Sequence, residues 1–180
     1  IGIYGGSMDV DSYGTETQGL VGVKSNEQEV ASSTQNKSVD VGSVFVEYTA
    51  AQGSSFGIEY YPGDATIGNS SRTDTGYESD GSTSSMTYTA KADVTDIWSV
   101  YMEPTVMFNE SYGVYGKVGL TTMYVKSLES LSNGTDSSTY PNADIWGAFY
   151  GLGLKARHSS GMFLKVETSI TEFQSINLTS

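Results

Sequence analysis

The sequence predicts an all-β fold, an up-and-down antiparallel barrel built from hairpins, and residues 98–124 give the strongest evidence for it. Apolar residues alternate with polar residues from Trp98 to Phe108, and the alternation resumes from Tyr112 to Tyr124. Alternation with period two is typical of a strand that separates two environments. The polar residues between the two halves supply a turn, so this stretch is a hairpin.

The two faces of this hairpin differ in chemistry. One face is mostly apolar and begins and ends in aromatic residues, whereas the other carries Glu103 and Lys117 at matching depth. Strands of this length, at ~3.3 Å per residue and a tilt of ~40°, cover roughly 25–30 Å, the height of the lipid-facing band of a membrane barrel. A soluble barrel hides its apolar face inside, so this pattern favours apolar side chains that face lipid and charges that face the interior.

Composition limits the protein classes that fit. The chain has 180 residues, with a hydrophobic content of 37%, a charged content of 17% and no cysteine. Both contents are low for a soluble domain, and no run of ~18 apolar residues predicts a transmembrane helix. The formal charge of −12 disfavours a nucleic-acid partner, because phosphate binding needs a basic patch. We expect one β-barrel domain over residues 1–180.

The same alternation predicts the other strands. In chain order we expect strands at residues 1–10, 39–50, 55–62, 98–108, 112–124, 145–156 and 161–173. Glycines weaken the pattern of the first strand. The second strand places Val44, Val46 and Tyr48 on one face, with Phe45 and Glu47 opposite.

The remaining strands have equally distinct faces. The third strand sets Phe56, Ile58 and Tyr60 opposite Glu59. In the last two strands, the apolar faces contain Trp146, Ala148, Tyr150, Leu152 and Leu154, and Met162, Leu164, Val166, Thr168 and Ile170. Each of these strands therefore has one face that suits an apolar solvent and one that does not.

The connections alternate between long and short. We expect long polar loops near residues 11–38, 63–90 and 126–143, and short turns at the other end of the strands. Outer-membrane barrels have short periplasmic turns and longer extracellular loops. This asymmetry predicts a periplasmic N-terminus and extracellular long loops.

This pattern resembles the small eight-stranded outer-membrane barrels of the OmpA and OmpX type, over nearly the whole chain, although no sequence motif matches. The resemblance implies an up-and-down antiparallel transmembrane barrel in the outer membrane of a Gram-negative bacterium, with side chains filling the lumen. The chain departs from the family in one respect, because seven strands are visible and the family has an even number. We expect an eighth strand beyond Ser180 in the natural gene product.

The inward faces of the strands predict a network of charges inside the barrel. The inward charged residues lie at similar distances from the short turns, and they are Glu47, Glu59, Glu103, Lys117, Lys155, Lys165 and Glu167. Buried charges must be paired, because an unpaired one costs several kcal/mol. We interpret the set as a plug of salt bridges; the alternative is a gate that re-pairs to open a narrow pore.

Aromatic residues recur at the strand ends. They predict interfacial aromatic girdles formed by Tyr48, Tyr60, Trp98, Phe108, Tyr112, Tyr124 and Trp146. The alternative for these residues is ordinary cross-strand packing in a soluble sheet.

Signals for catalysis are weak. The single histidine, His158, falls in an expected turn, and the sequence contains no metal-binding cluster and no phosphate-binding loop. We expect no enzyme activity, no cofactor and no metal. The expected role is structural or surface-interactive, with outer-membrane lipid around the barrel and phage, host or other cells meeting the acidic loops. The alternatives are a soluble ligand-binding barrel of the lipocalin type and a β-sandwich subunit of an extracellular or viral assembly.

Overall fold

The computed structural model describes residues 1–19, 28–77, 83–131 and 142–175. Within these ranges all regular structure is β, which confirms the prediction of an all-β, mostly antiparallel fold. The described part of the chain contains no helix long and apolar enough to cross a membrane.

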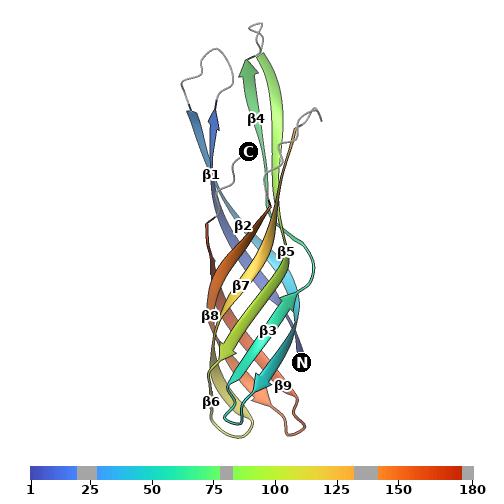
Figure 1. The fold of residues 1–180 in the computed structure, drawn as a ribbon, viewed down its shortest axis with the longest axis vertical. Helices are drawn as coiled ribbons and strands as arrows, with labels where there is room; N and C mark the ends of the chain where they lie inside the picture. Colours follow the sequence, from blue (N-terminus) through green and yellow to red (C-terminus); the bar gives the residue numbers. More distant parts are fainter. Residues whose placement is uncertain (20–27, 78–82, 132–141, 176–180) are drawn as a thin grey trace.

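The strands form a single tall sheet that curls about its long axis (Figure 1). The elements are β1 (Gly2–Gly19), β2 (Gln28–Thr49), β3 (Ser55–Tyr61), β4 (Ala65–Tyr77), β5 (Thr83–Glu103), β6 (Thr105–Met107), β7 (Tyr112–Leu131), β8 (Ala143–Arg157) and β9 (Phe163–Phe173). Neighbours in the sheet follow the order β1-β2-β3-β5-β7-β8-β9, and β4 and β6 pair with β5 and β7. The strands β1 and β9 are the two edges, and no backbone pairing joins them.

Two prolines divide what are otherwise continuous strands. Pro62 and Gly63, whose φ is +105°, separate β3 from β4, and Pro104 separates β5 from β6. Proline has no N–H to donate to a sheet, so it interrupts the ladder where it occurs. The strand β5 runs past the first break, pairing with β3 in its lower part and with β4 in its upper part.

Short turns close the lower end of the sheet in Figure 1. Gly53 (φ +97°) and Gly161 (φ +89°) adopt the left-handed conformation in the turns before β3 and β9. In the turn before β7, the Asn109 side chain accepts hydrogen bonds at 2.8 Å from the backbone N–H groups of Ser111 and Tyr112. Glycine and asparagine are favoured in such turns because they tolerate the required backbone conformations or hydrogen-bond the backbone directly.

The predicted long loops near residues 11–38 and 63–90 are wrong over much of their length. Strands β1 and β2 stay paired up to Gly19 and Gln28, and β4 and β5 stay paired up to Tyr77 and Thr83. The expected loop near 126–143 likewise begins as strand, because β7 continues to Leu131. The remaining parts of the three expected loops, at 20–27, 78–82 and 132–141, lie outside the described residues.

These hairpin extensions escaped the sequence analysis because their pattern is polar on both faces. Apolar alternation appears only when one face of a strand is buried. Serine and threonine can instead stabilise a water-exposed pair across the strands, as Ser71 and Thr89 do with a 3.0 Å hydrogen bond.

A β-bulge divides β5 into two parts with opposite phase. The register shifts between Thr95 and Trp98, where Asp96 has a φ of +52°. Below the bulge, Tyr101 and Glu103 are buried, whereas above it Val94 is buried. An extra residue in one strand moves every later side chain to the other face. The bulge therefore turns Val94 of β5 toward the concave face, where it packs with Met123 and Val125 of β7.

Candidate functional site

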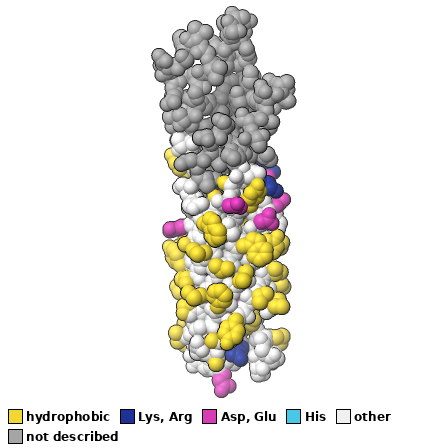
Figure 2. Space-filling model, in the orientation of Figure 1, with side chains coloured by type: hydrophobic (Ala, Val, Ile, Leu, Met, Phe, Trp, Pro, Cys, Tyr) yellow, Lys and Arg dark blue, Asp and Glu magenta, His cyan; other side chains and the backbone are white. Residues whose placement is uncertain are grey.

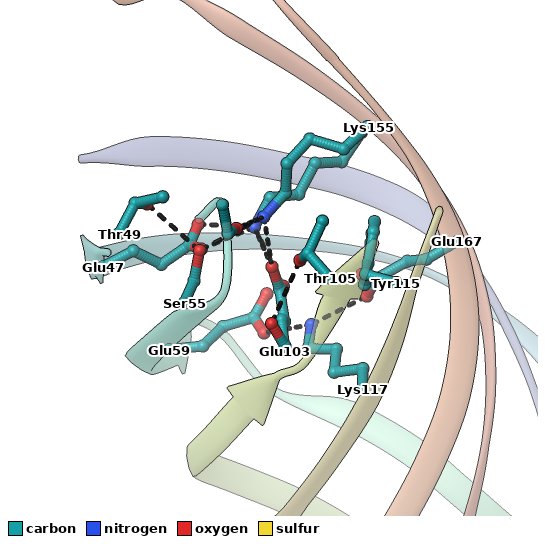
Figure 3. Close-up of polar contacts among 12 residues, drawn as sticks. Glu47, Thr49, Ser55, Glu59, Glu103, Thr105, Tyr115, Lys117, Lys155 and Glu167 are labelled. Carbon is teal, nitrogen blue, oxygen red and sulfur yellow. Dashed lines mark hydrogen bonds and ion pairs between the residues drawn. The ribbon is translucent and has the colours of Figure 1, made fainter. Parts of the chain in front are cut away.

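The charged residues expected to face inward all lie on the concave face of the sheet, below the bulge. Figure 3 labels all of them except Lys165 and shows their charged groups pointing toward one another. Glu103 and Lys117 are 1% and 5% exposed. The seven residues come from six strands of the sheet: Glu47 from β2, Glu59 from β3, Glu103 from β5, Lys117 from β7, Lys155 from β8, and Lys165 and Glu167 from β9. We call this set the charge network.

One part of the charge network is electrically balanced. The Lys165 ammonium contacts both carboxylate oxygens of Glu47 at 2.6 Å, and those of Glu103 at 2.6 and 2.8 Å. The Lys155 ammonium lies 3.1 Å from Glu103 and also donates to the Ser55 hydroxyl at 3.1 Å. Two carboxylates thus face two ammonium groups.

The other part has one base for two acids. The Lys117 ammonium donates to Glu167 at 2.8 Å and to Glu59 at 3.3 Å. Hydroxyl groups supply the remaining donors, with Tyr115 donating to Glu167 at 2.8 Å and Ser43 donating to Glu59. The charge network as a whole therefore carries one more acid than base among its seven members.

Tyrosine rings separate the ammonium groups from one another. The Lys117 ammonium lies 4.4 Å from the centre of the Tyr101 ring, and those of Lys155 and Lys165 lie 5.2 and 5.5 Å from the centre of Tyr115. Such cation–π contacts are stronger where water is excluded. Both rings pack over glycines, since a Cβ at Gly153 would lie 2.3 Å from the Tyr115 ring. Tyr101 and Tyr115 were not among the predicted site residues, although alternation places them on the same faces as Glu103 and Lys117.

The charge network is fully hydrogen-bonded. Among the described residues, no buried side-chain nitrogen or oxygen lacks a partner. Removing one member of a buried ion pair strands the other charge and typically costs about 3–5 kcal/mol. The arrangement is therefore suited to holding the strands together, beside a cavity of about 670 Å³ that Glu59, Glu103 and Lys117 line with residues of β1 and β9.

Above the bulge the concave face is apolar. Val94, Met123, Val125 and Ile145 are buried against one another, and Ile67 and Ile97 pack on them. We call these four buried residues the upper core. Between the charge network and the upper core, the buried hydroxyl of Ser99 donates a hydrogen bond to that of Thr121 at 2.9 Å, and apolar side chains occupy the interior beyond this pair.

The convex face shows the reverse pattern. Below the bulge its large apolar residues are exposed, with Val100 at 43% and Leu152 at 67%, and Figure 2 shows them as a belt around the visible side. The apolar belt comprises Ile1, Ile3, Val44, Val46, Phe56, Ile58, Val100, Met102, Val118, Leu120, Tyr150, Leu152, Leu154, Leu164, Val166 and Ile170. Above the apolar belt, the exposed residues include Lys91, Asp96, Lys126 and Asp144.

Aromatic residues border the apolar belt at both ends. Trp98 and Trp146 pair with Thr122 from opposite sides and so lie at one level, where Tyr60 stacks on Trp98 at 4.4 Å. Tyr124 lies two residues further along β7 and is partly buried. Tyr48, Phe108 and Tyr112 are exposed beside the short turns at the lower end. About ten residues of β7 separate the two levels, roughly 25 Å along the sheet axis at the tilt of a barrel strand.

Neither His158 nor a metal-binding cluster adds a catalytic site among the described residues. The His158 ring is exposed in the turn before β9, where its Nδ1 contacts the Ser160 hydroxyl at 2.9 Å. No group of three or more histidine, cysteine, aspartate or glutamate side chains among them could hold a metal ion.

Comparisons with known proteins found no relative of this chain. No protein-family model, no curated protein and no solved structure matches this chain.

Proposed function

We propose that this protein is an outer-membrane β-barrel protein with a structural and surface-interaction role. The observation that carries the proposal is the inversion of polarity along the same strands. Below the bulge the ionised groups are inside and the apolar groups outside, and above it the apolar groups are inside. In water alone, nothing would favour a change from inward charges to inward apolar residues at one level of the sheet. A membrane boundary at that level would favour it, because the lower part would then face lipid and the upper part water.

The size of the apolar belt supports a lipid environment. Soluble monomers rarely expose contiguous apolar patches larger than a few hundred Å². The belt runs from β1 to β9, and Glu172 of β9, which pairs with Ala148 just below the upper aromatic level, is the one charged residue on its described outward positions between the two aromatic levels. Its height of roughly 25 Å equals that of the apolar band of outer-membrane barrels.

The side chains inside the curled sheet favour a structural role rather than that of a channel. The side chains of the charge network are all hydrogen-bonded, and the upper core occupies the interior beyond it. Water and ions that enter the cavity beside the charge network would still have to displace the upper core to pass. A narrow pore remains the competing role, and planar-bilayer recordings separate the two: the structural role predicts no single-channel conductance, and steady openings would contradict it.

The long upper hairpins support surface interaction. Outer-membrane barrels place short turns in the periplasm and their long segments outside the cell. On that orientation the N-terminus of β1 is periplasmic, and the hairpins β1–β2 and β4–β5 project outward (Figure 1). Their serine, threonine and acidic side chains would meet phage, host surfaces or other cells.

Reconstitution tests this proposal. The purified chain should require detergent, insert into phospholipid vesicles, and migrate differently in electrophoresis before and after heating, as folded outer-membrane barrels do. Quenching of Trp98 and Trp146 fluorescence by brominated lipids should be strongest for bromines near the headgroups, because both residues lie at the upper border of the belt. A monomer that stays soluble without detergent and is not quenched would instead favour the lipocalin-type barrel or the β-sandwich.

A further inference from the structure

Above the level of Pro62, the curled sheet divides into two hairpins that stand apart (Figure 1). Below that level, β2 pairs with β3 from Val44 to Thr49. Above it, β2 pairs with β1 alone among the described strands, and β4 pairs with β5 alone. We call the opening between residues 28–43 of β2 and residues 65–77 of β4 the fork.

Both sides of the fork are unpaired sheet edges. Every second N–H and C=O group along such an edge has no ladder partner, and free edges are templates for a strand of another chain. Pro62, which has no N–H to donate, and Gly63, with a φ of +105°, lie at the base of the fork, where the pairing of β2 with β3 ends. A further strand that follows Ser180 and pairs beside β9 would leave the fork unfilled, because β2 and β4 lie elsewhere in the sheet.

A small cavity forms the floor of the fork. Its volume is about 80 Å³, and the residues that line it include Met8, Val41, Pro62, Val94 and Ile97. Val94 belongs to the upper core, and Ile97 packs on it. An apolar cavity of this kind favours an apolar occupant, and its size suits one side chain such as valine.

Two aspartates lie at the rim of this floor. Asp40 and Asp64 are exposed and line the same cavity. Lys37, the lysine of β2, pairs with Val10 and lies on the opposite face of the strand from Asp40. The rim therefore attracts a partner with lysine or arginine on its outward face and repels one with acids there.

The directions of the two edges restrict what can fill the fork. The strand β2 is antiparallel to β3, and both β3 and β4 are antiparallel to β5, so β2 and β4 run in opposite directions. A single inserted strand would be antiparallel to one edge and parallel to the other. The two strands of a β-hairpin also run in opposite directions, so each can pair antiparallel with one edge. A second copy in the same orientation cannot enter turn first, because its own upper hairpins point the same way.

We propose that the fork is a docking site for a β-hairpin of another protein, which enters turn first from above. The first strand of that hairpin pairs with β4 and the second with β2. An apolar residue at its turn fills the cavity, and basic residues on its outward face meet Asp40 and Asp64. This inference deepens the surface-interaction part of the proposed function and rests on it, because a partner reaches the fork only if the upper hairpins lie outside the membrane.

The test uses the full chain refolded in detergent micelles and fluorescent hairpin peptides, each closed by a disulfide and with about six residues per strand. The first peptide has a valine at its turn and lysines on one face, and the second has glutamates in place of the lysines. Anisotropy should report saturable binding of one lysine hairpin per chain, and about tenfold or more weaker binding of the glutamate hairpin. Absence of saturable binding, or equal affinity of the two peptides, would overturn the proposal.

A third peptide tests the pairing with the sheet edges. It is the lysine hairpin with N-methyl groups on the backbone nitrogens that point away from the hairpin's own ladder, so it keeps the charge but cannot donate to β2 and β4. Its affinity should also fall about tenfold or more, because each lost donor leaves a backbone carbonyl unpaired. Unchanged affinity would contradict strand pairing as the mode of docking.

Matched variants locate the bound hairpin. Asp40→Asn combined with Asp64→Asn should weaken binding of the lysine hairpin, whereas Asp144→Asn, at an exposed position of β8, should leave it unchanged. Equal effects of the two changes would contradict the placement at the fork.

A crosslinking control tests whether the fork closes on itself. The chain has no cysteine, so Ser38→Cys combined with Asn69→Cys places one thiol on each side of the fork. Without the hairpin this variant should not form a disulfide under mild oxidation. Rapid crosslinking would show that β2 and β4 pair with each other, and it would overturn the proposal.

The two proposals fail separately. A chain that inserts into vesicles but binds no hairpin would remove the docking site and leave the outer-membrane function. A chain that neither inserts nor needs detergent would remove the function itself, whatever the peptides do.

Discussion

The lower and upper halves of the sheet are built from the same strands with opposite polarity. In the lower half, Glu103 and Lys117 are buried while Val100 and Leu152 are exposed. In the upper half, the upper core is buried and charged residues such as Lys126 are exposed. A sheet has no intrinsic preference for either arrangement, since alternation only fixes which residues share a face. The contrast teaches that the surroundings of the two halves differ, with water around the upper half and, on the proposed function, lipid around the lower.

The largest expected effect comes from breaking the charge network. Lys165→Ala leaves the carboxylates of Glu47 and Glu103 without their shared ammonium, so it should lower the free energy of unfolding by about 3–5 kcal/mol. Urea unfolding of the chain in vesicles measures the change.

A matched substitution in the upper half serves as the control. Lys91→Ala breaks the exposed pair with Asp93 at 2.7 Å and should change the free energy of unfolding by at most about 1 kcal/mol. Similar losses from the two substitutions would show that the two halves do not differ in the burial of charge.

The next-largest effect is expected when a charge is placed on an outward position, because the lower and upper halves should tolerate it differently. Leu152→Arg puts a guanidinium in the middle of the apolar belt and should cost about 2–4 kcal/mol of unfolding free energy in vesicles. Ser71→Arg puts the same group on the exposed upper hairpin and should be nearly neutral. If Leu152→Arg is tolerated as well as Ser71→Arg, the two halves do not differ in their surroundings.

A smaller effect is expected when a single methyl group is removed. Ile145→Val trims a buried residue of the upper core and should lower the free energy of unfolding by about 0.5–1.5 kcal/mol. Ile170→Val trims an exposed residue of the belt and should cost less, because lipid tails can fill the space left by the methyl group. Unfolding midpoints of the two variants in the same vesicles provide the measurement, and a larger loss for Ile170→Val would contradict the assignment of inside and outside.

The smallest expected effect is on the titration of Asp93, on the upper half. Hydrogen bonds from Lys91 and then Thr66 hold the pKa of this carboxyl below its usual value, so the folded state favours the ionised form. Its contribution to stability is present above the ordinary aspartate pKa and is lost as the pH falls through the lowered one. Lys91→Ala should raise the pKa, which NMR titration of the carboxyl carbon measures. An unchanged pKa would mean that the contact with Lys91 is absent in solution.

Most of the lower half was predictable, and much of the upper half was not. Strict alternation around Glu103 and Lys117 predicted which side chains share the interior, because one face there is apolar and the other is not. The β4–β5 hairpin that includes Ser71 and Thr89 is polar in sequence on both faces, so no apolar pattern marked it as strand. The bulge at Asp96 has no apolar signature, and without it the burial of Val94 could not be inferred.

The order of residues alone established that this is an antiparallel β protein and which side chains share each face of a strand, because an extended backbone turns successive side chains to opposite sides. It could not establish which acid meets which base, that Glu59 and Glu167 share Lys117, or that an edge remains open beside β9. Those features depend on the curl of the sheet and on the shift of register at Asp96, which bring together residues more than fifty positions apart in the chain.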